Sequence, residues 1–410
     1  MTMLSALVGG LAATLHFAGA LKSTPALASL PFDLTLAAGL GLLAVLPLLV
    51  AARDWRADRA IALPLAAVGA LWLWMVVAGS WSPARLVLSA KLQETVLVGP
   101  AMLAAGIAVA ADAGALRAAA RTSLMIGIFT AGSVAFGIAT DQVVLGGQVG
   151  ANPDLVRVQY QIAGLAIASA AGLAAVRAAE VRRVMPVLAW AALVAGLGAA
   201  ALLPGGRTAL AGLALAVAIA PTVALWRQGR RALALTWPLG AIGAALAALA
   251  IILADPSLSA GLRTVERFTE GDFETSGRSW LWSVAAEEGG AALPFGLGTG
   301  GFAIATGNGD WRGAHPHNHA IEALAEGGLP GLLLWLGAFG GGAVAAMRLG
   351  LREDGWRVAR IAALVLPVAL TVMVSTDLGN RMAWFALGLA LGLGVTAEPR
   401  HVCALRQADR

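Results

Sequence analysis

Apolar segments of transmembrane length recur along the whole chain. Each holds roughly 20 residues, the length at which a helix crosses a hydrocarbon core of ~30 Å. We predict twelve such helices, over residues 3–21, 34–52, 61–79, 92–111, 122–140, 158–176, 185–203, 208–226, 233–253, 328–347, 358–376 and 381–396. The first run precedes Ala26-Leu27-Ala28, which imitates a signal-peptidase site, and we expect it to stay in the protein as the first span. The pattern predicts an all-α polytopic membrane protein whose residues 1–410 form a single integral-membrane domain.

One connection is much longer than the others. Residues 255–327 separate predicted spans nine and ten, and they hold three of the five histidines. Apolar residues at helical spacing within this loop predict short helices. Because polar and aromatic residues are scarce elsewhere in the chain, we expect the function to depend on this loop.

The composition excludes a soluble domain. Hydrophobic residues make up 59% of the chain and charged residues 12%, against about 25% charged in soluble domains. A soluble fold with so little charge would expose large apolar patches and aggregate. The 51 glycines suit membrane helices that pack closely. The bilayer is therefore the expected environment of the chain.

The basic residues indicate the orientation. Connections on one side of the predicted membrane, together with the C-terminal tail, hold 18 of the 28 basic residues, and the other side holds ten, four of them in the long loop. Since cytoplasmic loops carry the excess of Lys and Arg, we expect both termini in the cytoplasm of a bacterium, the chain in its inner membrane, and residues 255–327 in the periplasm.

Two other partner classes are excluded. The net charge of +5 could favour nucleic acid, but no continuous basic tract exists, so we predict no nucleic-acid binding. The single cysteine, Cys403, rules out an intramolecular disulfide framework.

Arg207 stands alone in a tight turn. It is the only charge in Pro204-Gly205-Gly206-Arg207, between two very apolar predicted spans. One interpretation is that Arg207 is an ordinary interfacial arginine, whose guanidinium group reaches water and has no further role. Charges held at such places by packing are usually functional, so Arg207 is a candidate site residue.

Arg278 begins a segment with helical spacing. Leu281, Val284 and Ala285 would share one face of a short helix over 278–288. We predict that this helix lies on the membrane, and the alternative from the spacing alone is an interfacial amphipathic helix that carries no chemistry.

A glycine-rich stretch follows. Gly296, Gly298 and Gly301 satisfy the spacing G-x-G-x-x-G, but no strand precedes them and no βαβ unit surrounds them, so we reject a dinucleotide site. We predict a sharply turning loop in which glycines allow close packing.

The segment His315-Pro316-His317-Asn318-His319 carries the strongest candidate chemistry. A zinc site would need acidic ligands such as Asp310 or Glu322, because no cysteine is available. Pro316 also prevents the regular strand conformation in which the three histidines would point to one side. A structural histidine cluster and a general base or substrate ligand are the alternatives, and we favour the last, because histidine exchanges a proton near neutral pH. Asn318 is suited to cap a short helix that ends at Gly327-Gly328, with Pro330 opening the next span.

These motifs together resemble a known family. Ser276-Gly277-Arg278, Trp282, Pro294, Gly296-x-Gly298, His317-Asn318 and Glu326-x-Gly328-x-x-Gly331 resemble the signature of the O-antigen ligase and polymerase superfamily. Gly206-Arg207-Thr208-Ala209 is similar to its arginine turn, and Ser80-Trp81-Ser82 with Lys91 to its element after the third span. The chain departs from the family at Ala320-Ile321, where an aromatic residue or leucine often stands, which leaves open which histidine is the working one.

The resemblance implies glycan transfer from an undecaprenyl-diphosphate-linked donor to a lipid A-core acceptor, with inversion and with neither metal nor cofactor. Arginines suit a diphosphate through bidentate contacts, and a neutral imidazole can accept the proton of the acceptor hydroxyl. The expected catalytic residues are His317, Arg207 and Arg278, and the expected substrate-binding residues are Lys91, Arg85, His315, His319 and Asn318.

Three other functions remain open from the sequence. An O-antigen polymerase of the same superfamily would extend the carrier-linked glycan instead of attaching it to lipid A-core. A transporter would usually show internal repeats and charges at the membrane midplane, and a scaffolding membrane protein would need no chemistry.

Overall fold

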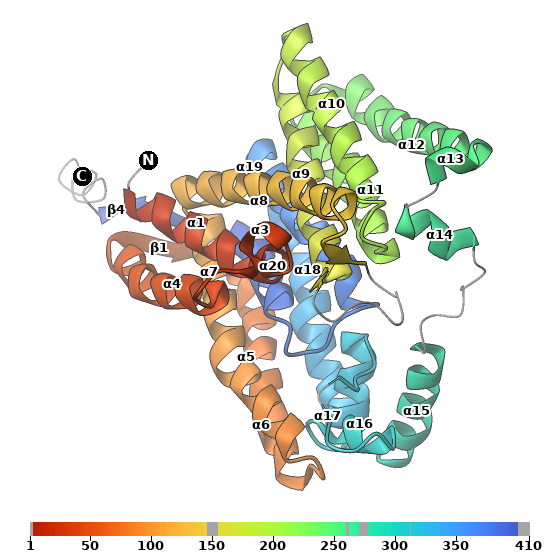
Figure 1. The fold of residues 1–410 in the computed structure, drawn as a ribbon. Helices are drawn as coiled ribbons and strands as arrows, with labels where there is room; N and C mark the ends of the chain where they lie inside the picture. The colour runs from red at the N-terminus through yellow and green to blue at the C-terminus, as the bar shows by residue number, and fades with distance from the viewer. Residues whose placement is uncertain (1–2, 146–154, 260–261, 270–277, 312, 401–410) are drawn as a thin grey trace, which may run out of the picture.

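The computed structural model describes residues 3–145, 155–259, 262–269, 278–311 and 313–400 (Figure 1). Within these residues, nine helices are long and apolar enough to cross a membrane, and three shorter apolar helices lie where the other predicted spans were expected. The twelve are α1 (Met3–His16), α4 (Leu34–Ala51), α5 (Ala62–Ala78), α6 (Leu86–Gln93) continued by η3 (Glu94–Val98) into α7 (Gly99–Ala111), α8 (Ala113–Ala139), α9 (Tyr160–Glu180), α10 (Val184–Ala200), α11 (Arg207–Arg227), α12 (Arg231–Ala254), α17 (His319–Trp335) continued by η4 (Leu336–Gly340) into α18 (Gly341–Gly350), α19 (Gly355–Val372) and α20 (Arg381–Leu391). The all-α polytopic fold is confirmed.

The fifth span begins well before the residue that the apolar pattern predicts. It starts at Ala113 rather than 122, because Asp112 accepts hydrogen bonds from the amides of Gly114 and Ala115. Hydropathy windows overlook a polar first turn that a capping side chain stabilises. The short helix predicted before the tenth span is present: Asn318 caps it at His319, and Gly328, with φ of +65° and ψ of −159°, interrupts α17 between this helix and the span.

The long connection holds short helices, as predicted. They are α13 (Pro256–Ser259), α14 (Arg263–Thr269), α15 (Arg278–Ala291) and α16 (Gly301–Ala305). The apolar face of α15 packs on α16 and α17, where Ala285, Phe302 and Ala325 form a buried cluster. That face therefore contacts protein, and the prediction that this helix lies on the membrane surface is wrong for it.

Two small sheets were not predicted. Strand β1 (Arg53–Ala57) pairs antiparallel with β4 (Val395–Pro399), and β2 (Val143–Val144) pairs parallel with β3 (Val156–Arg157). The first sheet joins the connection after the second span to the segment after the last one, which are both expected in the cytoplasm.

Small residues bring the central helices together. Helix α9 is the most buried of the candidate spans, and its Gly164 and Gly172 lie against Ala209 and Ala216 of α11. One turn along α11 from Ala209, Gly212 lies against Pro367 of α19. Small residues allow membrane helices to approach so closely. In contrast, α12 diverges from the bundle in Figure 1 and is exposed along its apolar length.

The connections between the helices gather at the two ends of the bundle. Each end holds the connections that the distribution of basic residues assigns to one side of the membrane. Arg53 pairs with Asp112, Arg227 donates to the Glu353 carbonyl, and Arg360 pairs with Glu180, all on the side expected to be cytoplasmic. The other connections meet around the histidines. Which group faces the periplasm stays a prediction.

Candidate active site

The histidine segment leads directly into α17. The Asn318 side chain caps the helix by accepting the amides of Ala320 and Ile321 at 2.9 and 3.1 Å. His317, just before the cap, has φ of +56°. A residue with a β-carbon adopts this left-handed conformation at a cost, and such residues concentrate at functional sites. The cap thus fixes the helix start, and the turn before it presents the His317 ring.

The loop after α19, residues 373–378, holds this segment from the other side. Asn318 Nδ2 donates to the Met373 carbonyl at 2.7 Å, and His319 Nε2 lies 2.9 Å from Thr376 Oγ1. His317 Nδ1 lies 3.5 Å from the Ser375 carbonyl oxygen. This loop was not predicted as part of the site. Its polar run Ser375-Thr376-Asp377, between two apolar helices, was the available signal.

Arg278 reaches the same loop. It begins α15, and its Nη2 donates to Ser375 Oγ at 3.1 Å. Ser375 therefore contacts two of the expected catalytic residues, Arg278 through its hydroxyl and His317 through its carbonyl. The packing of α15 on α17 fixes this meeting of two segments.

Burial keeps both neighbouring histidines neutral at physiological pH. It lowers the pKa of His317, the positive charge of Arg278 lowers it further, and the Ser375 carbonyl and Asp377 oppose these effects in part. Burial also lowers the pKa of His315 from 6.5 to about 3, against the attraction of Asp377. A neutral imidazole can accept a proton.

The three histidines face different partners. His315 Nδ1 accepts the backbone amide of His317 at 3.3 Å, whereas His317 and His319 turn to Ser375 and Thr376. In the part of the chain that the structure describes, no three His, Cys, Asp or Glu side chains gather in a way that could hold a metal ion.

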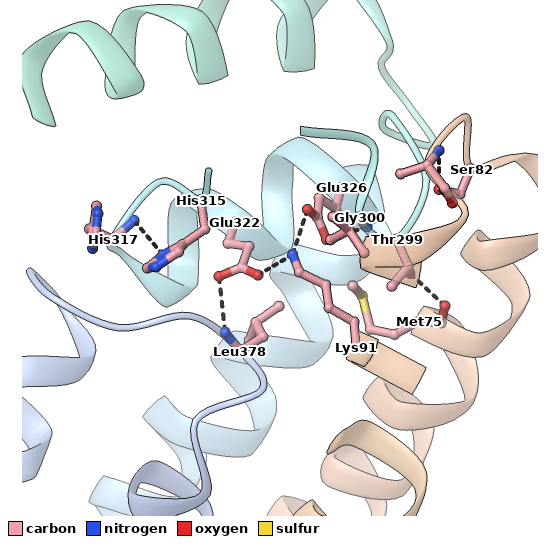
Figure 2. Close-up of polar contacts among 12 residues, drawn as sticks. Met75, Ser82, Lys91, Thr299, Gly300, His315, His317, Glu322, Glu326 and Leu378 are labelled. Carbon is pink, nitrogen blue, oxygen red and sulfur yellow. Dashed lines mark hydrogen bonds and ion pairs between the residues drawn. The ribbon is translucent and has the colours of Figure 1, made fainter. Parts of the chain in front are cut away.

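Lys91 forms a buried ion cluster beside the histidine segment (Figure 2). Its Nζ lies 2.6 Å from Glu322 Oε1 and 2.6 Å from Glu326 Oε1. The second oxygen of Glu322 accepts the Leu378 amide at 2.9 Å, and that of Glu326 accepts the Gly300 amide at 2.8 Å. One lysine of α6 therefore ties α17 to the glycine turn and to the loop after α19.

The glycine stretch is a sharp turn, as predicted. Gly296, Gly298 and Gly300 all have positive φ. A β-carbon on Gly298 would lie 2.8 Å from the Ser82 backbone, so only glycine allows this approach. Trp81 Nε1 donates to the Gly296 carbonyl at 3.1 Å. The Ser80-Trp81-Ser82 element thus docks the turn onto the end of α5.

Arg85 lies at the start of α6, where its side chain is exposed. The carboxylate of Asp310 accepts the backbone amides of Arg85, Leu86 and Val87 at 2.6–2.9 Å. The bonds from Leu86 and Val87 contribute most to lowering the pKa of Asp310. Asp310 therefore holds the long connection against α6, where the sequence analysis considered it as a metal ligand.

Arg207 is the first residue of α11, and Gly206 before it lies against the Tyr160 carbonyl. Gly212 of α11 lies against Pro367 of α19, and Gly355 of α19 lies against Ala224 of α11, so the two helices run antiparallel. Arg207 lies five residues before Gly212. Val372, the last residue of α19, lies five residues after Pro367. Arg207 thus lies at the end of the bundle that carries the loop after α19.

One cavity adjoins the histidine segment, and a larger cavity adjoins the first. The cavity of ≈ 130 Å³ is lined by His315, Ser375 and Asp377 together with residues of α9 and α19. The larger one, of ≈ 690 Å³, is lined by Lys22, Glu94, Arg157 and Arg381, among others. They share Ile162, Asp377, Asn380 and Met382. Space therefore extends from His315 across this end of the bundle. Of the motif residues, Ser276 and Gly277 lie outside the described residues.

These features define a polytopic α-helical membrane protein with a polar site at one end of its bundle. Residues 191–336 match the family model described as O-antigen ligase. This match supports the resemblance seen in the motifs: residues 191–336 are similar to the O-antigen ligase superfamily, whose members are glycosyltransferase-like enzymes of O-antigen and lipopolysaccharide processing. Comparison with curated proteins found no match. Arg207, Arg278 and the histidines lie inside the matched region, whereas Lys91 and the loop after α19 lie outside it.

Proposed function

We propose that the protein is an O-antigen ligase of the bacterial inner membrane. It transfers a glycan from undecaprenyl diphosphate to lipid A-core on the periplasmic side. The observation that carries the proposal is the meeting of His317 and Arg278 on Ser375, since it combines a neutral base with a cation suited to phosphate. The cavity that Ser375 and His315 line, together with the larger one next to it, offers room for a sugar.

In the proposed reaction the acceptor hydroxyl oxygen attacks the anomeric carbon of the donor sugar. The bond between that carbon and the phosphate oxygen breaks on the opposite side, so the configuration inverts and undecaprenyl diphosphate leaves. Arg278 and Arg207 bind the diphosphate and stabilise its growing negative charge. The reaction needs neither metal nor cofactor in this scheme.

His317 accepts the proton of the acceptor hydroxyl. A carbonyl oxygen can only accept, so the contact of Nδ1 with Ser375 favours the tautomer that carries hydrogen on Nδ1. The lone pair of Nε2 is then available to the acceptor. Of the residues expected to bind substrate, His315 and Asn318 support the turn that presents His317, and His319 anchors α17 to Thr376.

We assign Lys91 and Arg85, which the sequence predicts to bind substrate, two different roles. Lys91 is buried and bound by two carboxylates, so we propose that it is a positioning residue for α17 and the two loops. Arg85 is exposed beside the Asp310 contact, where it can meet a phosphate at the membrane surface.

The test is deletion of the chromosomal copy followed by gel analysis of lipopolysaccharide. For a ligase, the mutant makes full-length glycan that stays on the lipid carrier, and the wild-type chain on a plasmid restores long lipopolysaccharide whereas His317→Ala does not. Core bearing a single repeat in the mutant would instead identify a polymerase. Unchanged lipopolysaccharide would reject both.

A further inference from the structure

A second polar cluster lies at the opposite end of the bundle from the histidines. Arg117 and Arg121 of α8, Arg177 of α9 and Arg360 of α19, here called the arginine cluster, line one small cavity. Arg360 is in the second turn of α19, whose other end leads into the loop that holds His317. The proposed transfer reaction does not use these residues.

Positive charge predominates in the arginine cluster. Glu180 pairs with Arg177 at 2.5 Å and with Arg360 at 2.9 Å. Among the described residues, Arg117 and Arg121 form no ion pair and no side-chain hydrogen bond. Asp112, the acidic residue closest to them along the chain, is buried and bound by Arg53 at 2.9 Å. Four guanidinium groups therefore share one carboxylate.

The position of the arginine cluster indicates which kind of anion it binds. All four arginines lie within about two or three turns of a helix end, where the chain leaves the apolar part of the bundle. Like charges repel more strongly beside a low-dielectric medium than in water, so a bound anion is favoured. Arginine pairs bind phosphate in a planar, bidentate manner, and basic pockets between transmembrane helices bind anionic lipid headgroups.

The surface beside the cluster favours a lipid over a free ion. Met125 and Phe129 follow Arg117 and Arg121 at intervals of four residues, so the four side chains share one face of α8. Met125 is 64% exposed and Phe129 39% exposed. The cavity, of ≈ 20 Å³, is too small to enclose a phosphate group. A phosphate at its mouth with acyl chains along Met125 and Phe129 fits this arrangement.

We propose that the arginine cluster binds the phosphate group of an anionic phospholipid from the leaflet at that end of the protein. Arg117 and Arg121 bind the phosphate, and Arg177 and Arg360 add positive charge from the neighbouring helices. This site is independent of the proposed function, because it lies at the other end of the bundle.

The test compares melting temperatures of the purified full-length protein in neutral detergent. We expect phosphatidylglycerol to raise the melting temperature, and phosphatidylcholine or inorganic phosphate to leave it unchanged. The double variant Arg117→Gln/Arg121→Gln should lose most of the rise, and Arg117→Lys/Arg121→Lys should lose part of it, because lysine lacks the planar fork. Both arginines are exposed, so the variants should fold.

The matched control is Arg182→Gln/Arg183→Gln, which removes the same charge from exposed positions at the same end, outside the cavity. This variant should keep the full rise. An equal loss in the control would overturn the proposal in favour of general charge attraction. An equal rise with inorganic phosphate would overturn it in favour of a soluble anion, and no rise with phosphatidylglycerol would reject the site.

Discussion

His317 and Arg278 contact the same serine from two segments, yet they are expected to act on different parts of the reaction. The arginine would bind the donor diphosphate and the histidine would take the acceptor proton. Each loss would lower the rate by a similar factor, about 10²–10³ for a preorganised charge and about 10²–10⁴ for a general base. Binding therefore separates the two roles better than the rate does.

We expect Arg278→Ala and Arg207→Ala to weaken binding of the lipid-diphosphate donor, and His317→Ala to leave donor binding intact while abolishing transfer. Arg278→Lys should restore only part of the activity, since lysine keeps the charge but loses the bidentate geometry. Donor binding and single-turnover transfer by the purified variants check this. If His317→Ala transfers normally and His315→Ala is inactive, the general base is His315 rather than His317. Normal transfer by all three histidine variants would reject a histidine base.

The pH dependence follows from the environment of His317. Burial and Arg278 lower its pKa, so the neutral, active form predominates at pH 7. The rate of transfer should be level around neutrality and should fall as the pH decreases through a pKa below 6.5. Arg278→Gln removes a charge that lowers this pKa, so the acid limb of its residual activity should move to higher pH. An acid limb that stays in place in Arg278→Gln would contradict the proximity of the two groups.

At the scale of elements, a few long-range contacts hold the site together. The Lys91 cluster joins α6 to α17, to the turn at Gly300 and to the loop at Leu378. The Trp81 and Ser82 contacts join the end of α5 to the same turn. Changes at these contacts should affect folding and positioning rather than the chemistry itself.

Lys91→Met should destabilise the protein strongly, because it leaves two carboxylates buried without their cation, a loss that typically costs ~3–5 kcal/mol. The neutral variant Lys91→Met/Glu322→Gln/Glu326→Gln should recover stability, since no buried charge remains. It should still transfer more slowly, with donor binding little changed, if Lys91 positions the site. Thermal unfolding and transfer rates are the measurements. Lys22→Met is the control, because Lys22 pairs with Asp33 at the exposed surface, and it should change stability little.

Gly298→Ala should destabilise the docked turn, because the added carbon would lie 2.8 Å from the Ser82 backbone. Gly307 has a similar positive φ of +72° but nothing within 4 Å of an added carbon. Gly307→Ala therefore carries the backbone cost, about 1–2 kcal/mol, without the steric clash. The amount of folded protein and its melting temperature should fall further for Gly298→Ala. Equal losses in both variants would show that docking on Ser82 contributes nothing.

At the scale of the whole molecule, the orientation of the bundle decides whether the substrates can reach the site. The basic residues predict the histidine end in the periplasm. Reporter fusions after Arg59, Arg183 and Arg352 should report cytoplasm, and fusions near Thr269 and Asn308 should report periplasm. A cytoplasmic signal at Asn308 would leave the proposed active site on the wrong side of the membrane for both substrates.

Some features of the site could be predicted from a few neighbouring residues in the sequence. Asn318 as a helix cap, Arg278 at a helix start and the turn at Gly296 and Gly298 were all predicted correctly. Each depends on a few neighbouring residues, because capping and turn geometry are short-range. The partners of Lys91 could not be read in this way, because Glu322 lies 231 residues further along the chain.

The sequence by itself determined the membrane environment, the apolar helices of the described residues, the resemblance to the O-antigen ligase superfamily and the segment that carries the histidines. These depend on local apolar length and on short motifs, which neighbouring residues encode. Only the tertiary structure decided that Ser375 joins His317 to Arg278, that Lys91 is buried in an ion cluster, and that β1 pairs with β4. The physical reason is that helix packing brings together residues distant in the chain, and the pattern of any one helix does not specify the neighbours it will meet.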